Sequence, residues 1–311
     1  MPNPQKTTID WLRFRTQAAP VEALEALRPM FGTLGGDLRL KPLERGILGF
    51  QRGAQIAVED LILGRMDFGG DQMRGWVRVD LPGGGCEWVT DWPAADNLGD
   101  LPKASIRRVD VALTTWKGEV THDQVVQAHQ LGRFTVRRPP VLQTIESSDP
   151  FAGRTCYIGN RQTSDKFMRT YEKGFEMMKG LPSGLDRSTI TLVDGFPPAD
   201  IYRCEVEFKP VTCDIPWDLI ARRDEYFAGT YPFCADVLPG VDADVLQRRP
   251  ERTAQTSMAI ALEHLRIQYG PILFTALAAH GGDFMAVWDK VVGTTHNQKL
   301  LEQGVLLVDH F

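Results

Sequence analysis

No stretch of this 311-residue sequence is long and apolar enough to cross a membrane, and cysteines are few. The longest strongly apolar stretch, residues 271–280, has about half the length that a membrane-spanning helix needs, and no basic-then-apolar leader opens the sequence. The five cysteines include no Cys-x-x-Cys pair, so we expect reduced, buried thiols rather than a zinc ribbon or a disulfide framework. The composition predicts a cytoplasmic globular protein whose core needs no crosslinks.

Motifs of three classes of DNA-processing enzyme are also absent. The six histidines include no His-x-His pair, the metal-binding element of one class of nicking enzyme. No His-x-x-Arg element is present, which argues against a tyrosine recombinase. The sequence has no G-x-x-x-x-G-K-[ST] motif, so a P-loop helicase is excluded.

Negative charge exceeds positive charge overall, but unevenly along the chain. There are 35 Lys and Arg residues against 40 Asp and Glu, for a formal net charge of −5, which argues at first against a nucleic-acid partner. Residues 101–180, however, contain 13 Lys and Arg against 8 Asp and Glu, which leaves 22 against 32 elsewhere. A basic segment within an acidic protein is typical of a local anion-binding face.

Alternation of polar and apolar residues predicts strands over most of the first two thirds of the chain. The predicted strands are residues 9–15, 47–51, 57–63, 76–81, 87–90, 106–113, 155–159, 167–173 and 201–209. Two helices interrupt them, at 20–30 and from Thr121, where Gln124 completes a capping-box spacing. The tail is helical, with an expected stop at Gly270-Pro271 and further helices at 284–292 and 298–305. No internal repeat is visible.

Four predicted strands combine one apolar face with one charged face. Because side chains two residues apart share a face, each strand places its charged residues together, whereas a single such strand would more often be an ordinary solvated surface. If the four strands are neighbours, the following residues converge: Asp80, Asp110, Glu205, Glu207, Arg78, Arg108, Arg169 and Tyr171.

The residue types on this face fit metal-assisted phosphoryl transfer. Mg²⁺ or Mn²⁺ takes carboxylates together with substrate phosphate oxygens, and arginine forks suit phosphate. Tyr171 is the candidate nucleophile. A phosphotyrosyl intermediate would conserve the energy of the broken phosphodiester, so the DNA strand could later be resealed.

Five segments together resemble the Rep_trans replication initiation factor family. They are Y-I-G-N-R-Q-T-S-D at 157–165, R-T-Y-E-K-G at 169–174, Y-R-C-E-V-E-F-K at 202–209, I-D-W at 9–11 and R-R-V-D-V-A at 107–112. The resemblance covers roughly residues 9–210. The family includes rolling-circle plasmid initiators, filamentous-phage replication proteins and relaxases of some integrative elements.

The resemblance implies roles for individual residues. Tyr171, in the R-x-Y-x-K element, would attack one strand at the origin, leaving a 5′-phosphotyrosyl link and a free 3′-OH primer. The metal carboxylates map onto Asp80, Asp110 and Glu205, with Glu207 as a further candidate. Thr114 stands where plasmid members often have a second acid, so either Glu207 or Asp80 completes the metal shell, or that second acid is not a ligand. The remaining phosphate or DNA contacts would be Arg78, Arg108, Arg161, Arg169, Lys173 and Tyr157, although Tyr157 suits a structural hairpin role as well.

The resemblance also implies an architecture and partners. An RRM-like or ferredoxin-like antiparallel sheet with helices on one face would form an α+β catalytic domain at 1–211, followed by an irregular connection at 212–252 and a helical region at 253–311. The expected partners are origin DNA with a single-stranded or hairpin nick site, a host helicase and replication proteins, and a second copy in a homodimer, all in a bacterial host cell.

Two other functions remain open. A non-catalytic origin-binding or single-strand-binding protein would use the same aromatic and basic side chains for stacking and phosphate contact. Such a face gains nothing from Asp80, Asp110 and Glu205, which repel phosphate unless a cation lies between. A conjugative relaxase would share the proposed chemistry.

Overall fold

The computed structural model describes residues 5–181, 185–248 and 250–307. Contacts divide the chain into two compact units, Met1–Leu246 and Gln247–Phe311. The first contains an antiparallel sheet with helices packed on it, and the second is helical. The predicted α+β class and the helical carboxyl-terminal region are therefore confirmed.

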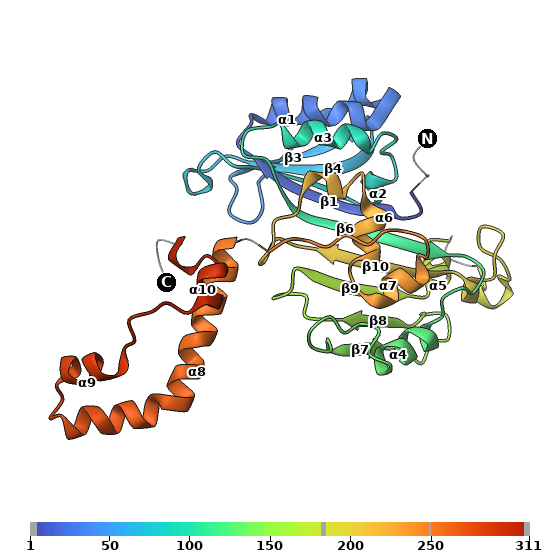
Figure 1. Cartoon of the computed structure of the whole chain (residues 1–311). Coiled ribbons are helices and arrows are strands. Elements are labelled where there is room, and N and C mark those ends of the chain that lie inside the picture. The colour runs from blue at the N-terminus through green and yellow to red at the C-terminus, as the bar shows by residue number, and fades with distance from the viewer. Residues whose placement is uncertain (1–4, 182–184, 249, 308–311) are drawn as a thin grey trace. The chain divides into compact units, whose positions relative to one another are not determined.

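One antiparallel sheet of ten strands forms the first unit (Figure 1). The strands are β1 (Thr8–Thr16), β2 (Arg39–Leu43), β3 (Arg52–Val58), β4 (Leu61–Phe68), β5 (Val77–Pro82), β6 (Ser105–Thr115), β7 (Leu142–Ile145), β8 (Thr155–Ile158), β9 (Lys166–Tyr171) and β10 (Tyr202–Phe208). Their order in the sheet is β2-β3-β4-β5-β1-β6-β10-β9-β8-β7.

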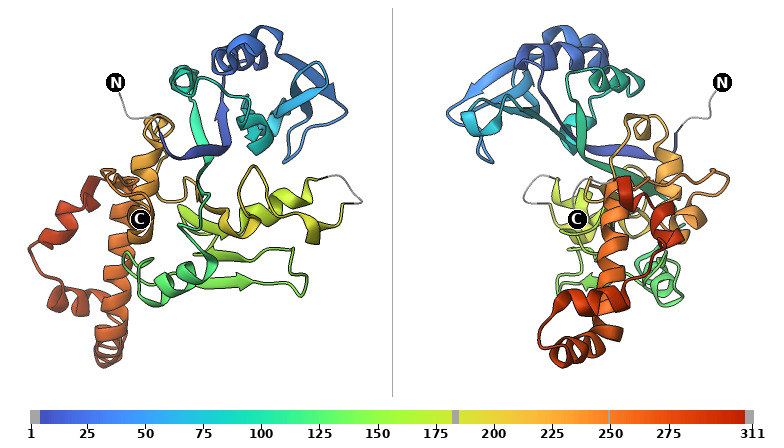
Figure 2. Two further views of the ribbon diagram at one scale, coloured as in Figure 1. Left: turned by 90° about the vertical axis from the view of Figure 1, so that its right-hand side faces the viewer. Right: turned by 60° about the vertical axis from the view of Figure 1, so that its left-hand side comes forward.

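The two halves of this sheet have the same connectivity. In each half, a first strand leads through a helix into a meander of four strands, and the last of these pairs with the first. The first half uses β1, α1 (Pro20–Leu27) and β2 to β5, and the second uses β6, α4 (His122–Gln130) and β7 to β10. β1 and β6 pair in the middle. Figure 2 shows the first half in blue to cyan and the second in green to yellow. The fold thus contains a repeat that the sequence conceals.

Helices cover the apolar face of the sheet. The remaining helices of the first unit are α2 (Gly83–Cys86), α3 (Asp96–Gly99), α5 (Lys173–Lys179), α6 (Arg223–Ala228) and α7 (Pro232–Val237). Of these, α5 does not cover the main core and packs in a separate small apolar cluster. One buried cluster joins Leu12, Val79 and Val206 of the sheet to Leu27 of α1 and Phe227 of α6. Because strand side chains alternate, the charged residues of the central strands lie on the opposite face. We call this opposite surface the charged face.

Most of the predicted elements are confirmed. The strands expected at 9–15, 76–81, 106–113, 155–159, 167–173 and 201–209 correspond to β1, β5, β6, β8, β9 and β10. The helix from Thr121 also has its predicted capping box. The Thr121 hydroxyl accepts a hydrogen bond from the Gln124 amide (3.3 Å), and the Gln124 side chain accepts one from the Thr121 amide (2.9 Å).

Three predicted strands are wrong. Residues 47–51 form a loop, and 57–63 contains the turn between β3 and β4 rather than one strand. The segment 87–90 is not a strand because α2 follows β5 directly; Gly85 approaches the backbone of Leu63 so closely that a Cβ there would lie 1.7 Å from its carbonyl oxygen. This helical turn depends on glycine, whereas the sequence predicts at residues 83–85 only a turn that closes the preceding strand.

The segment predicted as an irregular connection at 212–252 contains α6 and α7 and belongs largely to the first unit, which extends to Leu246. The buried Asp224 of α6 accepts hydrogen bonds from the amides of Lys6 and Thr7 and from the Thr7 hydroxyl. Phe227 is fully buried. These contacts tie the segment to the beginning of β1, more than 200 residues earlier, so local composition could not predict them.

The second unit contains α8 (Pro250–Ala279), α9 (Phe284–Val291) and α10 (Gln298–Glu302). The expected helix stop at Gly270-Pro271 is wrong, because α8 continues through Pro271. A proline inside a helix removes one backbone hydrogen bond, but the helical residues on both sides maintain the element. Within the described parts of the chain, no helix combines the length and hydrophobicity needed to cross a membrane.

Candidate active site

The second half of the charged face brings three predicted carboxylates together. In the antiparallel β6–β10 pair, Asp110 lies opposite Glu207 and Ala112 lies opposite Glu205. Asp110, Glu205 and Glu207 are 1%, 3% and 5% exposed. Three acidic side chains are therefore concentrated on two adjacent strands, where burial must be compensated by partners or cations.

Arginines pair with each of these carboxylates. Arg108 Nε donates to Asp110 Oδ1 at 2.8 Å, and its Nη2 lies 3.2 Å from Glu207 Oε2. Arg169 Nη2 donates to both oxygens of Glu205 at 2.7 Å. The buried Nε of Arg169 has no hydrogen-bond partner in the described part of the molecule. The site therefore retains an arginine donor for a further acceptor.

Burial raises the pKa of Asp110 to about 7, against the hydrogen bond and positive charge of Arg108. The negative charges of Glu205 and Glu207 add to the rise. Burial also opposes ionisation of Glu207, but hydrogen bonding from Arg161 and the charge of Arg108 lower its pKa overall. Asp110 is therefore more easily protonated than a free aspartic acid, chiefly because it is buried.

Tyr171, at the end of β9, lies beside this cluster. Its hydroxyl donates a long hydrogen bond to Glu205 Oε2 at 3.5 Å, and the Arg169 guanidinium lies 5.3 Å from the centre of its ring. Burial and the negative charge of Glu205 raise the pKa of Tyr171 well above that of a free phenol, and Arg203 partly offsets the rise. The phenol is therefore protonated at neutral pH and needs a base and added positive charge to react.

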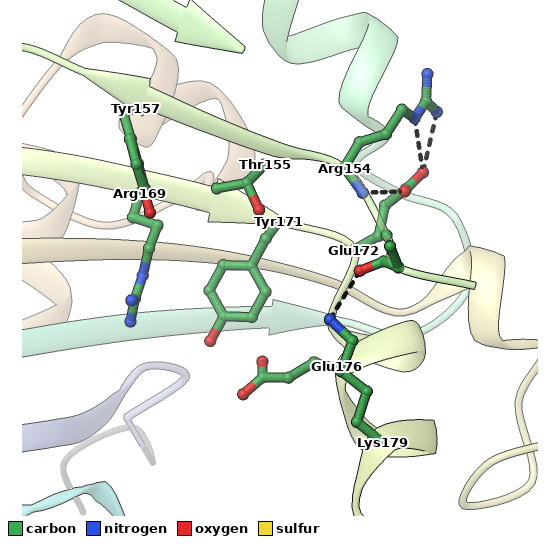
Figure 3. Close-up of a pocket in the computed structure, with 10 residues that line it drawn as sticks. Arg154, Thr155, Tyr157, Arg169, Tyr171, Glu172, Glu176 and Lys179 are labelled. Carbon is green, nitrogen blue, oxygen red and sulfur yellow. Dashed lines mark hydrogen bonds and ion pairs between the residues drawn. The ribbon is translucent and has the colours of Figure 1, made fainter. Parts of the chain in front are cut away.

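A hollow surrounds the Tyr171 ring (Figure 3). Its walls come from β8, β9, α5 and the loop before β8: Ala152, Gly153, Arg154, Thr155, Tyr157, Arg169, Glu172, Glu176 and Lys179. Figure 3 shows the Glu176 carboxylate turned toward the Tyr171 hydroxyl, and this negative charge also raises the tyrosine pKa. Apart from Lys173, the α5 residues at this hollow were not predicted, because their position depends on how α5 turns back after β9.

Asp80 and Arg78 lie elsewhere on the charged face. Asp80, on β5, accepts hydrogen bonds from Trp11 Nε1 at 2.6 Å and Arg13 Nη2 at 3.0 Å, and it pairs with Arg78. Strand β1 separates β5 from β6. The structure therefore does not bring Asp80 together with Asp110 and Glu205, and the carboxylates predicted to converge form two clusters instead of one.

The remaining predicted phosphate- or DNA-binding residues lie around the cluster of Asp110, Glu205, Glu207 and Tyr171. Arg161 donates to Glu207 Oε2 at 3.0 and 2.7 Å. Lys173 Nζ is 3.1 Å from Glu176 and 5.8 Å from the Tyr171 ring centre. Tyr157 lies opposite Arg169 in the β8–β9 pair and lines the hollow. Lys173 and Tyr157 are thus placed near Tyr171, whereas Arg161 lies beside Glu207 and Phe167 toward the other end of β9.

Two further residues belong to this neighbourhood and were missed as site residues. A register shift in the β1–β6 pair between Ile9 and Trp11 marks a bulge at Asp10, and its carboxylate accepts a hydrogen bond from Arg203 Nη1 at 3.1 Å. Arg203 lies opposite Tyr171 in the β9–β10 pair. The I-D-W motif contained a signal for Asp10, but strand alternation alone would have assigned that residue the wrong neighbours.

Comparison with known proteins identifies the family. The model of the Rep_trans family, described as replication initiation factor, matches residues 104–257, and the chain belongs to this family. The match includes Asp110, Tyr171 and Glu205, whereas the I-D-W segment at 9–11 lies outside it. No curated protein matches the chain.

A solved structure, that of the rolling-circle replication initiator protein from Geobacillus stearothermophilus, is similar to this one with a TM-score of 0.51. The two chains are 20% identical, and the alignment covers 77% of this chain and 99% of that chain. At this level of identity the likeness concerns the fold.

Proposed function

We propose that this family member initiates rolling-circle replication by nicking one strand of origin DNA with Tyr171 and later rejoining it. The observation that carries the proposal is the position of the Tyr171 hydroxyl, 3.5 Å from Glu205 and beside Arg169, at the edge of the buried carboxylate cluster. Attack on a phosphodiester forms a bond from the tyrosine oxygen to phosphorus and expels the 3′ oxygen. The products are a 5′-phosphotyrosyl link and a free 3′-OH that can prime synthesis.

Residues around Tyr171 can control its proton and its charge. Glu205 accepts the hydroxyl hydrogen bond, and Glu176 faces the same oxygen, so either carboxylate can take the proton as the bond to phosphorus forms (Figure 3). Arg203 favours the phenolate by its charge. Arg169, with its unpartnered Nε, can donate to a phosphate oxygen.

The carboxylates support a divalent-cation site by their chemistry. Asp110, Glu205 and Glu207 are hard oxygen donors of the kind that Mg²⁺ or Mn²⁺ binds. Burial, with a smaller contribution from Glu205 and Glu207, raises the pKa of Asp110, and a bound cation would favour its ionised form. The described residues contain no group of three acidic, histidine or cysteine side chains placed to hold a metal ion, and Arg108 and Arg169 hydrogen-bond to Asp110 and Glu205. When bound, the ion would polarise the scissile phosphate. Asp80 remains a predicted metal ligand, but it would have to reach the ion from its own cluster with Arg13 and Arg78, across strand β1.

The test of the nucleophile is a covalent adduct. Purified protein with Mn²⁺ should attach to the 5′ end of a nicked strand from its own replicon's origin. Tyr171→Phe should abolish the adduct and change DNA binding by less than about twofold, because only the hydroxyl is removed. Tyr157→Phe is the matched control, since this second tyrosine lines the same hollow. An adduct that survives in Tyr171→Phe and disappears in Tyr157→Phe would reassign the nucleophile.

Chelation separates this function from a purely binding role. With EDTA, adduct formation should stop and return on addition of Mn²⁺, because phosphate attack needs the cation's charge. A non-catalytic origin-binding protein would form no adduct under either condition. A conjugative relaxase would form the same adduct but act on transfer-origin DNA. A host helicase, other replication proteins and a second copy of the chain are the partners we propose for initiation.

A further inference from the structure

The first half of the sheet repeats the geometry of the active site but has no nucleophile. In the second half, Arg169 lies opposite Glu205, and Tyr171 lies opposite Arg203 on the same two strands. In the first half, Arg65 lies opposite Asp80, and Asp67 lies opposite Arg78. Since β4 and β5 correspond in connectivity to β9 and β10, Asp67 occupies the place of Tyr171.

Two pairs of arginines lie directly opposite each other on neighbouring strands, close to the first-half residues Arg65, Asp67, Arg78 and Asp80. Arg15 lies opposite Arg78 in the β1–β5 pair, and Arg13 lies opposite Arg108 in the β1–β6 pair. Like charges directly across two strands destabilise a sheet. Asp67 and Asp80 neutralise two of the four first-half arginines (Arg13, Arg15, Arg65 and Arg78), which leaves two positive charges in surplus.

Two of these arginines retain donors for an anion. Arg15 donates from Nε to Ser105 Oγ at 3.2 Å, and no acidic side chain in the described part of the chain pairs with it. The Arg78 side chain is 10% exposed, and its buried Nε has no hydrogen-bond partner within the same described residues. A buried donor without an acceptor is costly, and a phosphate oxygen would satisfy it.

Two tryptophans complete this surface. The Arg15 guanidinium lies 4.2 Å from the ring centre of Trp76, and the Arg108 guanidinium lies 4.2 Å from that of Trp11. Aromatic rings next to arginines are the elements with which proteins hold single-stranded nucleic acid without reading its sequence. Trp11 also lies between the two halves, because its strand β1 pairs with β6.

We infer that the first half of the sheet is a non-catalytic repeat of the active site. It binds the single-stranded DNA that flanks the phosphodiester presented to Tyr171. The first-half site consists of Arg13, Arg15, Arg78, Trp11 and Trp76. Four strand spacings separate β9 from β5, about 19 Å, which corresponds to about six nucleotides at the rise of a duplex strand. This inference rests on the proposed function, since it assigns the site a part of the same substrate.

The experiment measures binding to fluorescein-labelled oligo(dT) strands of four and twelve nucleotides by anisotropy, with the full-length protein in EDTA so that no cleavage occurs. The twelve-nucleotide strand can reach both halves, whereas the four-nucleotide strand cannot. Arg15→Ala should weaken binding of the longer strand by about three- to tenfold and of the shorter strand by less than about twofold. The slope of log affinity against log salt should fall by about 0.7 for the longer strand.

Two variants control the result. Arg15→Lys keeps the charge and should restore most of the affinity for the longer strand. Arg28→Ala removes an arginine from the end of α1 on the covered side of the sheet, where it pairs with Glu25, and should leave both affinities unchanged. Equal loss for both strands, or no loss for either, would refute the inference. A failure of the adduct test with Tyr171 would leave this dependence on strand length untouched, so the two proposals fail separately.

Discussion

The protonation of Asp110 offers a quantitative test of the carboxylate cluster in the absence of any cation. Burial raises its pKa from 3.8 to about 7, and Glu205 and Glu207 contribute. Between these two values the folded protein binds a proton that the unfolded chain does not. Stability contributed by this group must therefore increase as the pH falls through the window from about 7 toward 4, the opposite of an ordinary ion-paired aspartate.

The magnitude follows from the two pKa values. The linkage relation predicts that acidification from about pH 7.5 to about pH 5.5 adds roughly 2 kcal/mol to the unfolding free energy through Asp110 alone. Asp110→Asn has no titrating group at this position, so it should lack this increment. The predicted quantity is the difference in unfolding free energy between wild type and Asp110→Asn, which cancels the contributions of titrating groups that do not interact with Asp110.

Urea unfolding in EDTA, followed by tryptophan fluorescence at several pH values, measures this difference. Wild type should gain about 2 kcal/mol relative to Asp110→Asn between the two pH values. Mn²⁺ at pH 7.5 should stabilise wild type more than the variant, because only wild type has the buried Asp110 carboxylate for the ion to bind. A difference that stays constant, or that changes in the opposite direction, would mean that Arg108 keeps Asp110 ionised and that the cluster is already balanced.

Two further predictions concern local structure. Thr121→Ala removes the hydroxyl that caps α4 and should lower the unfolding free energy by about 1 kcal/mol, whereas Thr121→Ser should retain most of it; urea unfolding compares the two. Asp10→Asn weakens the ion pair that holds Arg203 beside Tyr171 and should slow adduct formation roughly tenfold with little change in DNA affinity. If the single-turnover rate of adduct formation is unchanged in Asp10→Asn, then the ion pair between Asp10 and Arg203 does not contribute to catalysis.

The prediction of individual strands succeeded because alternation is a local property. In β6, Val109 and Val111 point to the core while Arg108 and Asp110 point to the charged face, and this sorting can be read from neighbouring residues. It failed where backbone conformation depends on distant atoms, as at α2, whose Gly85 fits directly against the Leu63 backbone.

The candidate site was predictable only in part. Tyr171 and the carboxylates of β6 and β10 could be identified from their motifs and shared face, and the structure places them together. Asp80 has the same chemical character but lies across β1 in a separate cluster, since side-chain alternation carries no information on which strands become neighbours. Strand order is decided by long-range packing of the whole sheet.

The sequence by itself determined the faces of the strands, the cap of α4 and the family motif around Tyr171, because each depends on residues close together in the chain. The tertiary structure alone decided how those faces combine. It joined Asp10 to Arg203 across 193 positions, turned α5 toward Tyr171 and paired two halves of equal connectivity through β1 and β6. These arrangements arise because distant segments bury their apolar side chains in one shared core, and the sequence of a single segment does not show which other segments it will pack against.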